Sequence, residues 1–252
     1  MLRGIPVPTL QLPMRLLPLL LPGLLLLPAC AQTRVSSAPA AGDLAGEESV
    51  KPGINDSWKG DDIDPLVGRL ESESREIFTR RRLLGAVVGP PAGASIADVG
   101  AGSGFMTHLF SRLVGPEGRV YAVDINESLL GHIADGARER GLENIETVLG
   151  TEKSVELPEA SVDVVFICDT YHHFEYPRNS MASIHRALRP GGQLLLVDFE
   201  RIPGVSRDWL LDHVRAGKEV FRAEIEAAGF RLVAEHDLEE LKENYCLRFE
   251  RI

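Results

Sequence analysis

The sequence is short of cysteine and of positive charge. Of its three cysteines among 252 residues, Cys168 and Cys246 lie in apolar, strand-like runs, so we predict two unpaired buried thiols rather than a disulfide. Neither has the spacing of a metal ligand, and we assign no metal-binding residue. Lysine and arginine total 27 against 37 acidic residues, and the net charge of −10 argues against a general nucleic-acid binder, which needs a basic face. Small or cationic substrates are compatible with this charge.

Acidic residues are absent from the first 29 positions, where the only charges are Arg3 and Arg15. Leucine dominates residues 16–27, and an apolar run this short after basic residues is typical of a secretory signal rather than a membrane span. The Leu-Leu-Pro-Ala that precedes Cys30 resembles the lipobox of a bacterial lipoprotein. We predict a signal peptide over 1–29 and a lipid anchor at that cysteine. An ordinary signal peptide and an uncleaved anchor are the alternatives.

Apolar periodicity is almost absent from residues 31–62, which are rich in alanine, serine, glycine, proline and acidic residues. We therefore predict a flexible linker over 30–62, followed by a folded domain over 63–252. Such a tether lets a lipid-anchored domain stand off a membrane, so we expect a membrane partner. The expected location is the periplasmic side of the cell envelope, with the cytoplasmic face as the alternative.

Strand and helix patterns alternate after residue 63, beginning with one expected helix over 64–88 that the following Pro-Pro-Ala-Gly ends. The later elements are a strand at 95–99, a helix at 104–114, a strand at 119–124, a helix at 127–140, strands at 144–148 and 162–168, a helix at 177–189, a strand at 193–199, a helix at 217–228, and strands at 230–236 and 244–251. This alternation predicts an α/β fold with a doubly wound, mostly parallel, seven-stranded Rossmann-like sheet. The last connection is too short for a crossover helix, so the last strand should run antiparallel as a hairpin with its predecessor.

A glycine turn joins the strand at 95–99 to the following helix. Gly100, Gly102 and Gly104 alternate, and Phe105 stands where a dinucleotide-binding turn would have its third glycine. A glycine turn at a helix N-terminus can cradle a nucleotide, because nothing blocks the close approach of the ligand to the backbone. The spacing therefore favours a single nucleoside with no pyrophosphate.

Polar residues end two further strands at the same edge of the expected sheet. Asp124 closes the strand at 119–124, where a carboxylate can accept both hydroxyls of a ribose. Its alternative role, capping the next helix, suits Asn126 better. The residue between them, Ile125, would pack on a purine face.

The strand at 162–168 leads into a second polar cluster. It contains Asp169, Tyr171, His172 and His173, which lie where side chains that contact substrate are expected. We expect one of the last three to touch the substrate.

With these segments in place, the chain from about residue 64 to 252 resembles a class I S-adenosylmethionine-dependent methyltransferase. The matching motifs are Asp-Val-Gly-Ala-Gly-Ser-Gly-Phe at 98–105, Asp124, Leu-Pro-Glu-Ala-Ser-Val-Asp at 157–163, Tyr-His-His-Phe at 171–174 and Leu-Arg-Pro-Gly-Gly-Gln-Leu at 188–194. The resemblance is greatest to the small-molecule branch that includes quinone-biosynthesis methyltransferases. It implies S-adenosyl-L-methionine as cofactor and a small molecule as methyl acceptor.

The resemblance also implies roles for individual residues. Asp124 would hold the ribose, and Asp169 would lie by the methionine carboxylate or sulfonium. Thr151 and Glu152 would meet the adenine edge, where many relatives have Gly-Asp. The methionine moiety would be lined by Asp98, Gly100, Ala101, Gly102, Ser103 and Gly104.

Methyl transfer from a sulfonium is an in-line displacement, so alignment of the reactants supplies much of the acceleration. If the acceptor must lose a proton, His172 or His173 has a suitable intrinsic pKa to act as base, and Tyr171 could hydrogen-bond the acceptor. Secondary candidates are Glu71, Arg75, Trp209, His213 and Tyr245.

The export signal conflicts with the cytoplasmic origin of this cofactor and leaves three interpretations open. The domain is an active methyltransferase on a membrane-associated or exported substrate, or a non-catalytic ligand-binding domain with a degenerate methyltransferase fold, or an enzyme kept inside by an uncleaved anchor. A dehydrogenase is disfavoured by Phe105, and an arsenic methyltransferase would need more thiols near the site.

Overall fold

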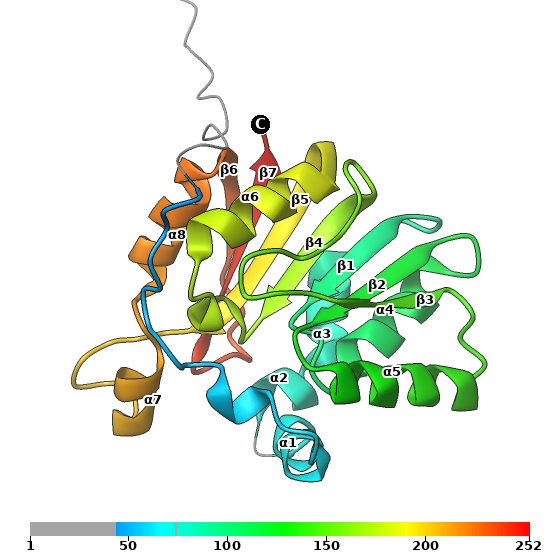
Figure 1. Ribbon diagram of the computed structural model, residues 1–252, viewed down its shortest axis with the longest axis horizontal. Coiled ribbons are helices and arrows are strands. Elements are labelled where there is room, and N and C mark those ends of the chain that lie inside the picture. Colours follow the sequence, from blue (N-terminus) through cyan, green and yellow to red (C-terminus); the bar gives the residue numbers. More distant parts are fainter. Residues whose placement is uncertain (1–43, 74) are drawn as a thin grey trace, which may run out of the picture. The chain divides into compact units, whose positions relative to one another are not determined.

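The computed structural model describes residues 44–73 and 75–252 (Figure 1). The predicted signal peptide, the predicted lipidation site at Cys30 and the first part of the predicted linker lie outside the described residues. The helices within the described ranges are all too short or too polar to cross a bilayer.

A seven-stranded sheet forms the centre of the described domain. Its strands are β1 (Ser95–Val99), β2 (Arg119–Asp124), β3 (Ile145–Leu149), β4 (Val162–Cys168), β5 (Leu188–Phe199), β6 (Phe230–His236) and β7 (Asn244–Arg251). Their order is β3-β2-β1-β4-β5-β7-β6. Neighbours from β3 to β5 pair in parallel, whereas β7 runs antiparallel to both β5 and β6. The predicted doubly wound sheet with an antiparallel last strand is confirmed.

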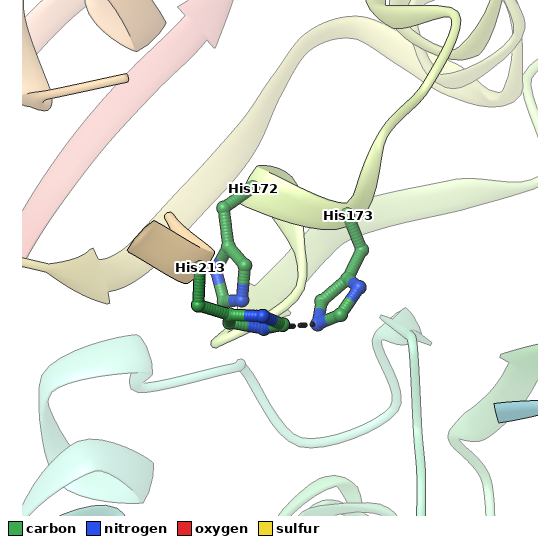
Figure 2. A group of neighbouring side chains, drawn as sticks. All are labelled: His172, His173 and His213. Atoms are coloured by element: carbon green, nitrogen blue, oxygen red, sulfur yellow. Dashed lines mark hydrogen bonds between the residues drawn. The ribbon is translucent and has the colours of Figure 1, made fainter. Parts of the chain in front are cut away.

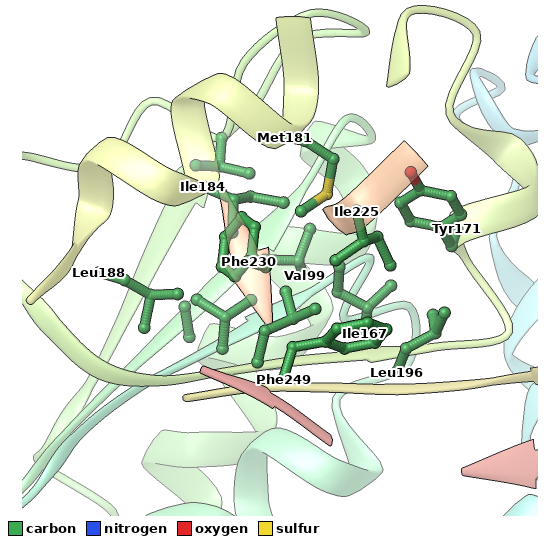
Figure 3. Close-up of a cluster of buried hydrophobic side chains, with 14 of the residues drawn as sticks. Val99, Ile167, Tyr171, Met181, Ile184, Leu188, Leu196, Ile225, Phe230 and Phe249 are labelled. Carbon is green, nitrogen blue, oxygen red and sulfur yellow. The ribbon is translucent and has the colours of Figure 1, made fainter. Parts of the chain in front are cut away.

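Helices cover both faces of this sheet. In chain order they are α1 (Asp64–Leu70), α2 (Glu76–Thr79), α3 (Arg81–Val88), α4 (Phe105–Val114), α5 (Glu127–Glu139), α6 (Pro177–Ala187), α7 (Asp208–His213) and α8 (Lys218–Ala227), with 3-10 turns η2 (Asp56–Trp58) and η3 (Tyr171–His173). Side chains alternate along each strand, so neighbouring strand residues enter different hydrophobic clusters. One cluster joins the sheet to α6 and α8, and Figure 3 shows part of it, with Met181, Ile184 and Ile225 packed over strand residues such as Ile167. A second cluster joins the opposite face to α3 and α4. A third, smaller cluster includes Leu130 and Ile133 of α5.

The expected single helix over 64–88 is wrong, because the chain breaks into α1, α2 and α3. The first break follows Leu70, and Arg75 has an extended backbone with φ −89° and ψ 119° before α2 begins. The intervening sequence is rich in serine and glutamate, and serine side chains compete with the helical hydrogen bonds of the backbone. The break turns Arg75 toward the carboxyl end of the sheet, where it meets Asp169.

The second part of the predicted linker differs from our expectation, because residues 47–60 pack along the domain; we call this segment the strap. Glu47 accepts hydrogen bonds from the backbone N–H groups of Arg178 and Asn179 at the start of α6, each at 2.8 Å. At the other end, the Asn126 side chain donates to the carbonyl oxygens of Trp58 and Gly60. These contacts are polar and far apart in sequence, so hydrophobic periodicity gives no sign of them.

The other predicted elements agree with the structure within two residues at each end, except that β5 starts five residues early, at Leu188. The helix α7 and the two 3-10 turns have no counterpart in the prediction. Cys168 and Cys246 are free thiols on β4 and β7. Both pair in register with Val197 of the intervening β5. Two strand spacings separate them by about 10 Å, which is beyond disulfide reach.

Candidate active site

A cavity opens at the carboxyl ends of β1, β2 and β4 and brings most of the predicted site residues together. Its lining includes Asp98, Gly100, Ala101, Gly102, Ser103, Asp124, Ile125, Thr151, Glu152, Asp169 and His173. Gly104 is the exception among the cofactor-binding candidates, because it lies outside the lining as the N-cap residue of α4. The cavity lies where parallel α/β sheets hold their ligands.

The glycine turn has a backbone that side chains would obstruct. Gly100 has φ +73°, and a Cβ built on it would lie 2.2 Å from the Thr170 Cγ2 atom. Gly102 has φ +56°, and its Cβ would lie 2.8 Å from Leu70. Both positions therefore need glycine for the backbone conformation and for the space around it.

Asp124 is held at the edge of the cavity by backbone donors. Its Oδ2 accepts from the Gly102 N–H at 2.9 Å, and its Oδ1 accepts from the Asn126 N–H at 3.0 Å. Each carboxylate oxygen keeps a second lone pair, so the side chain can accept further hydrogen bonds from a ligand. Asn126, as predicted, caps α5 by accepting from the Leu129 N–H at 3.1 Å. Burial raises the pKa of Asp124.

Asp98 provides a second buried carboxyl in the same wall. It is 3 % exposed and accepts a hydrogen bond from the Thr107 hydroxyl at 2.6 Å. Burial raises its pKa to about 7, the hydrogen bond from Thr107 partly opposes this rise, and the charge of Asp124 adds to it. Two carboxyl groups in one enclosed wall give this side of the cavity a negative character that suits a cationic ligand.

Asp169 connects the cavity to Arg75, a residue that the sequence ranked only as a secondary candidate. The Arg75 guanidinium lies 2.5 Å from the Asp169 Oδ2. The Asn244 side chain donates a hydrogen bond to the Asp169 Oδ1 at 2.6 Å. Asp169 has φ +48°, a conformation that is uncommon for a residue with a side chain. Burial raises its pKa, and the adjacent guanidinium opposes that rise. Because Arg75 also lines the cavity, it offers donors to an anionic group of a ligand.

Thr151 and Glu152 form the side of the cavity that we predicted to face an adenine. The backbone of Thr151 pairs with Ser154 in an isolated bridge. The Glu152 Oε1 lies 2.7 Å from the Lys59 Nζ on the strap. The strap therefore closes this side of the cavity.

His172, His173 and His213 form a cluster, which we call the histidine cluster (Figure 2). Of the three, only His173 lines the cavity. Its Nε2 lies 3.3 Å from the His213 Nε2, and its buried Nδ1 has no hydrogen-bond partner among the described residues. Burial, followed by the neighbouring imidazoles and more distant cations, lowers the pKa of His173 to about 2. A base this weak fits hydrogen bonding to a ligand better than proton abstraction at neutral pH.

Two of the three predicted catalytic residues do not reach the cavity. Tyr171 is fully buried, and its ring packs against Phe174 and Phe221 with centroids 5.0 Å apart in each case. His172 is 1 % exposed, and its Nδ1 lies 2.8 Å from the Asp198 Oδ1. Tyr171 begins η3, which follows the end of β4 after two intervening residues, and this turn directs its ring into the core although it is adjacent to the histidines in sequence.

The other secondary candidates divide between these regions. His213 joins the histidine cluster, whereas Glu71, Trp209 and Tyr245 lie outside the cavity lining. The lining also contains residues that sequence reasoning missed: Asn55, Trp58, Leu70 and Thr170. A tryptophan within an otherwise polar stretch was the one available signal, because an isolated large aromatic residue needs a packing partner. In the structure, Trp58 meets the His173 ring edge to face at 5.6 Å.

Part of the chain is similar to known proteins. Residues 97–196 match the methyltransferase domain family. The matched region includes the glycine turn, Asp124 and the Tyr-His-His segment. It ends before α7 and begins after the strap, so the surroundings of His213 lie outside the matched region.

Curated relatives are similar to part of the chain. The ubiquinone/menaquinone biosynthesis C-methyltransferase UbiE of Hahella chejuensis is 37% identical over 114 residues, which cover 45% of this chain and 46% of the relative. UbiE of Pseudomonas putida is 36% identical over 114 residues, covering 45% and 44% of the two chains. The match thus spans less than half the length of these relatives.

Solved structures extend the likeness to the methyltransferase fold. A SAM-dependent methyltransferase from Aquifex aeolicus has 25% identity and a TM-score of 0.65, over 74% of this chain and 97% of that one. The [4+2]-cyclase SpnF has 18% identity and a TM-score of 0.64, over 86% and 98%. The second neighbour, named as a cyclase, shows that the fold alone does not decide the reaction.

Proposed function

We propose that this protein is an S-adenosyl-L-methionine-dependent methyltransferase that acts on a small-molecule acceptor. The observation that carries the proposal is the Asp124 carboxylate, which the Gly102 and Asn126 N–H groups hold at the cavity edge beside the glycine turn. A buried carboxylate with free lone pairs, next to backbone that only glycine can form, provides what an adenosine ligand needs.

The residues present fit the cofactor. The Asp124 oxygens would accept the ribose hydroxyls, and Ile125 would pack on the adenine. Gly100 and Gly102 leave room for the methionine moiety, whose sulfonium charge suits the wall that contains Asp98. The Arg75 guanidinium would bind the methionine carboxylate, with Asp169 positioning it.

When bound, the cofactor supplies an electrophilic methyl group on a sulfonium. The chain itself contributes binding, orientation and exclusion of water, and alignment of the reactants is the main source of acceleration in such a displacement. The strap closes part of the cavity through Asn55 and Trp58. His173, a neutral imidazole at physiological pH, would hydrogen-bond the acceptor and fix its orientation.

The acceptor side of the cavity combines apolar and polar groups. Phe174 and Trp58 provide aromatic surface near His173, which is the polar group among them. This combination fits a small molecule with an apolar ring or chain and one hydrogen-bonding substituent. The UbiE relatives, whose names place them in quinone biosynthesis, support an acceptor of this kind.

We also propose that the chain is attached to the cell envelope through its N-terminal segment. The support is the sequence: two basic residues, a leucine-rich run and Cys30 in a lipobox-like context. An active domain in that location would act on a membrane-associated or exported molecule.

The test is calorimetric titration of the full chain with S-adenosyl-L-methionine and with its demethylated product, S-adenosyl-L-homocysteine. We expect one site per chain for both, with dissociation constants on the order of micromolar. Labelled methyl donor should then transfer its label to a small molecule in an extract of membrane lipids and metabolites. Binding of neither nucleoside overturns the proposal, and binding of both without transfer favours the non-catalytic alternative.

A further inference from the structure

The histidine cluster brings together residues from two distant segments of the chain. His172 and His173 lie on η3, and His213 is the last residue of α7, 40 residues after His173. Each imidazole offers one nitrogen, and these nitrogens all lie within 4.8 Å of one another. We propose that His172, His173 and His213 bind a divalent transition-metal ion of the class that prefers imidazole, such as Zn²⁺.

The spacing of two of the nitrogens is that of ligands on one ion. A tetrahedral zinc with Zn–N bonds of 2.0–2.1 Å separates its ligand nitrogens by about 3.3–3.4 Å. The His173 Nε2 and the His213 Nε2 are 3.3 Å apart, which agrees with this separation. The upper limit of 4.8 Å on the distances between the three ligand nitrogens exceeds the tetrahedral value by about 1.5 Å. A small rotation of the side chains removes this difference.

Asp198 prepares the third ligand. Its Oδ1 lies 2.8 Å from the His172 Nδ1, and both side chains are buried, at 0% and 2% exposure. A carboxylate accepts but does not donate, so this contact places the proton on Nδ1 and leaves the lone pair on Nε2. A carboxylate behind a histidine ligand is the usual support of a metal-binding imidazole, because it fixes both the tautomer and the ring orientation.

The other two imidazoles are also held in place. Lys51 of the strap donates to the carbonyl oxygens of Asp212 and His213, each at 2.7 Å, and so fixes the end of α7. The Asn55 side chain donates to the His173 carbonyl oxygen at 3.1 Å. The strap therefore positions both His173 and His213. A preformed metal site requires ligands that are held in place in this way.

Three histidine ligands leave a fourth position open, as in catalytic zinc sites. His173 also lines the cavity, so the ion would lie at its acceptor side. There the open position would take an oxygen or nitrogen of the methyl acceptor. This last step rests on the proposed function, whereas metal binding itself does not.

The test is titration of the full chain, free of any histidine tag and first stripped with a chelator, with Zn²⁺ alone, followed by metal analysis after dialysis. We expect one ion per chain. His213→Ala should weaken binding at least 100-fold and Asp198→Asn by about 10- to 100-fold. His132→Ala, a histidine on α5 outside the cluster, should leave the affinity unchanged. Cobalt in place of zinc should give the visible spectrum of a tetrahedral site, and His213→Ala should abolish it.

Circular dichroism of each variant shows whether it is folded, and His213 is chosen because it is less buried than His172. Failure of the folded wild-type chain to bind stoichiometric Zn²⁺, or undiminished binding by folded His213→Ala, overturns the metal site. Titration of the same preparations with S-adenosyl-L-homocysteine separates the two proposals. Loss of metal binding with retained nucleoside binding contradicts this inference alone, and the reverse result contradicts the proposed function alone.

Discussion

The two sides of the cavity are assembled in different ways. The side formed by the glycine turn and Asp124 comes from one continuous stretch, β1-α4-β2, and its contacts join residues that the chain itself brings close. The histidine cluster depends on three segments that lie far apart in the sequence, namely the strap, η3 and the end of α7. The side formed by the glycine turn thus depends on a local motif, whereas the side formed by the histidine cluster depends on the completed fold.

The two sides also differ in charge. The side formed by the glycine turn contains the buried carboxyl groups of Asp98 and Asp124, whereas on the other side burial lowers the pKa of His173 to about 2, so that this imidazole is neutral at physiological pH. One side therefore favours a cation and the other a neutral hydrogen-bonding group or a metal ion. The difference matches a reaction that brings a charged donor to an uncharged acceptor.

The largest effect is expected from Gly100→Ala, which tests whether the local motif tolerates any side chain. The new Cβ would lie 2.2–2.8 Å from atoms of the Thr170 side chain. The alanine would also have to keep the left-handed backbone conformation of Gly100. Clash and strain together should lower the free energy of unfolding by about 3–5 kcal/mol. Urea unfolding followed by circular dichroism measures the change.

Gly141→Ala is the matched control for that variant. Gly141 has φ +62°, and its Cβ would meet no atom within 4 Å, so the substitution adds backbone strain without a clash. We expect a loss of about 1–2 kcal/mol. Equal losses in the two variants would contradict the close approach of Gly100 to Thr170.

Sequence reasoning could place the glycine turn and Asp124 together because the determinants of their positions are local. Alternating glycines between a strand and a helix, and Asp124 at the next strand end, need only strand and helix periodicity to be placed at one edge. Asn126 was identifiable as the helix cap for the same reason. The sheet followed from the alternation of elements and from one short connection.

The other side could not be predicted in this way. Tyr171 and His172 follow the same strand as His173, and only the packing of η3 decides which of them faces the cavity. The strap has the composition of a linker, yet Lys51 and Asn55 hold it through side-chain hydrogen bonds to distant backbone carbonyl oxygens. The break after Leu70, which directs Arg75 to Asp169, lies in a helix-like pattern of apolar residues.

Asp124→Ala is expected to have the next largest effect, this time on binding. The variant loses the ribose acceptor and leaves the buried Gly102 N–H without its partner. We expect the affinity for S-adenosyl-L-homocysteine to fall by roughly 30- to 150-fold, or about 2–3 kcal/mol. Calorimetry measures it, with Glu127→Ala, an exposed acid nearby in sequence, as the control that keeps wild-type affinity. His213→Ala should also bind normally, and a comparable loss there would show that the two sides are not separate.

Counted per pH unit, the smallest effect is the pH dependence of stability that comes from Asp98. Its pKa is about 7 in the folded chain and near 3.8 when the chain is unfolded, so between these values the folded state holds a proton that the unfolded state releases. Stability should therefore fall as the pH rises from about 4 to 7, by at most about 1.4 kcal/mol per pH unit from this group.

Asp98→Asn removes that contribution while keeping an oxygen to accept from Thr107. The difference in unfolding free energy between variant and wild type should grow in favour of the variant across this pH range and stay constant above it. Asp62→Asn, at an exposed position on the N-terminal side of α1, should show no such trend. If Asp98→Asn follows the wild-type pH profile throughout, then Asp98 is ionised at ordinary pH. The side formed by the glycine turn would then carry more negative charge than the burial of Asp98 predicts.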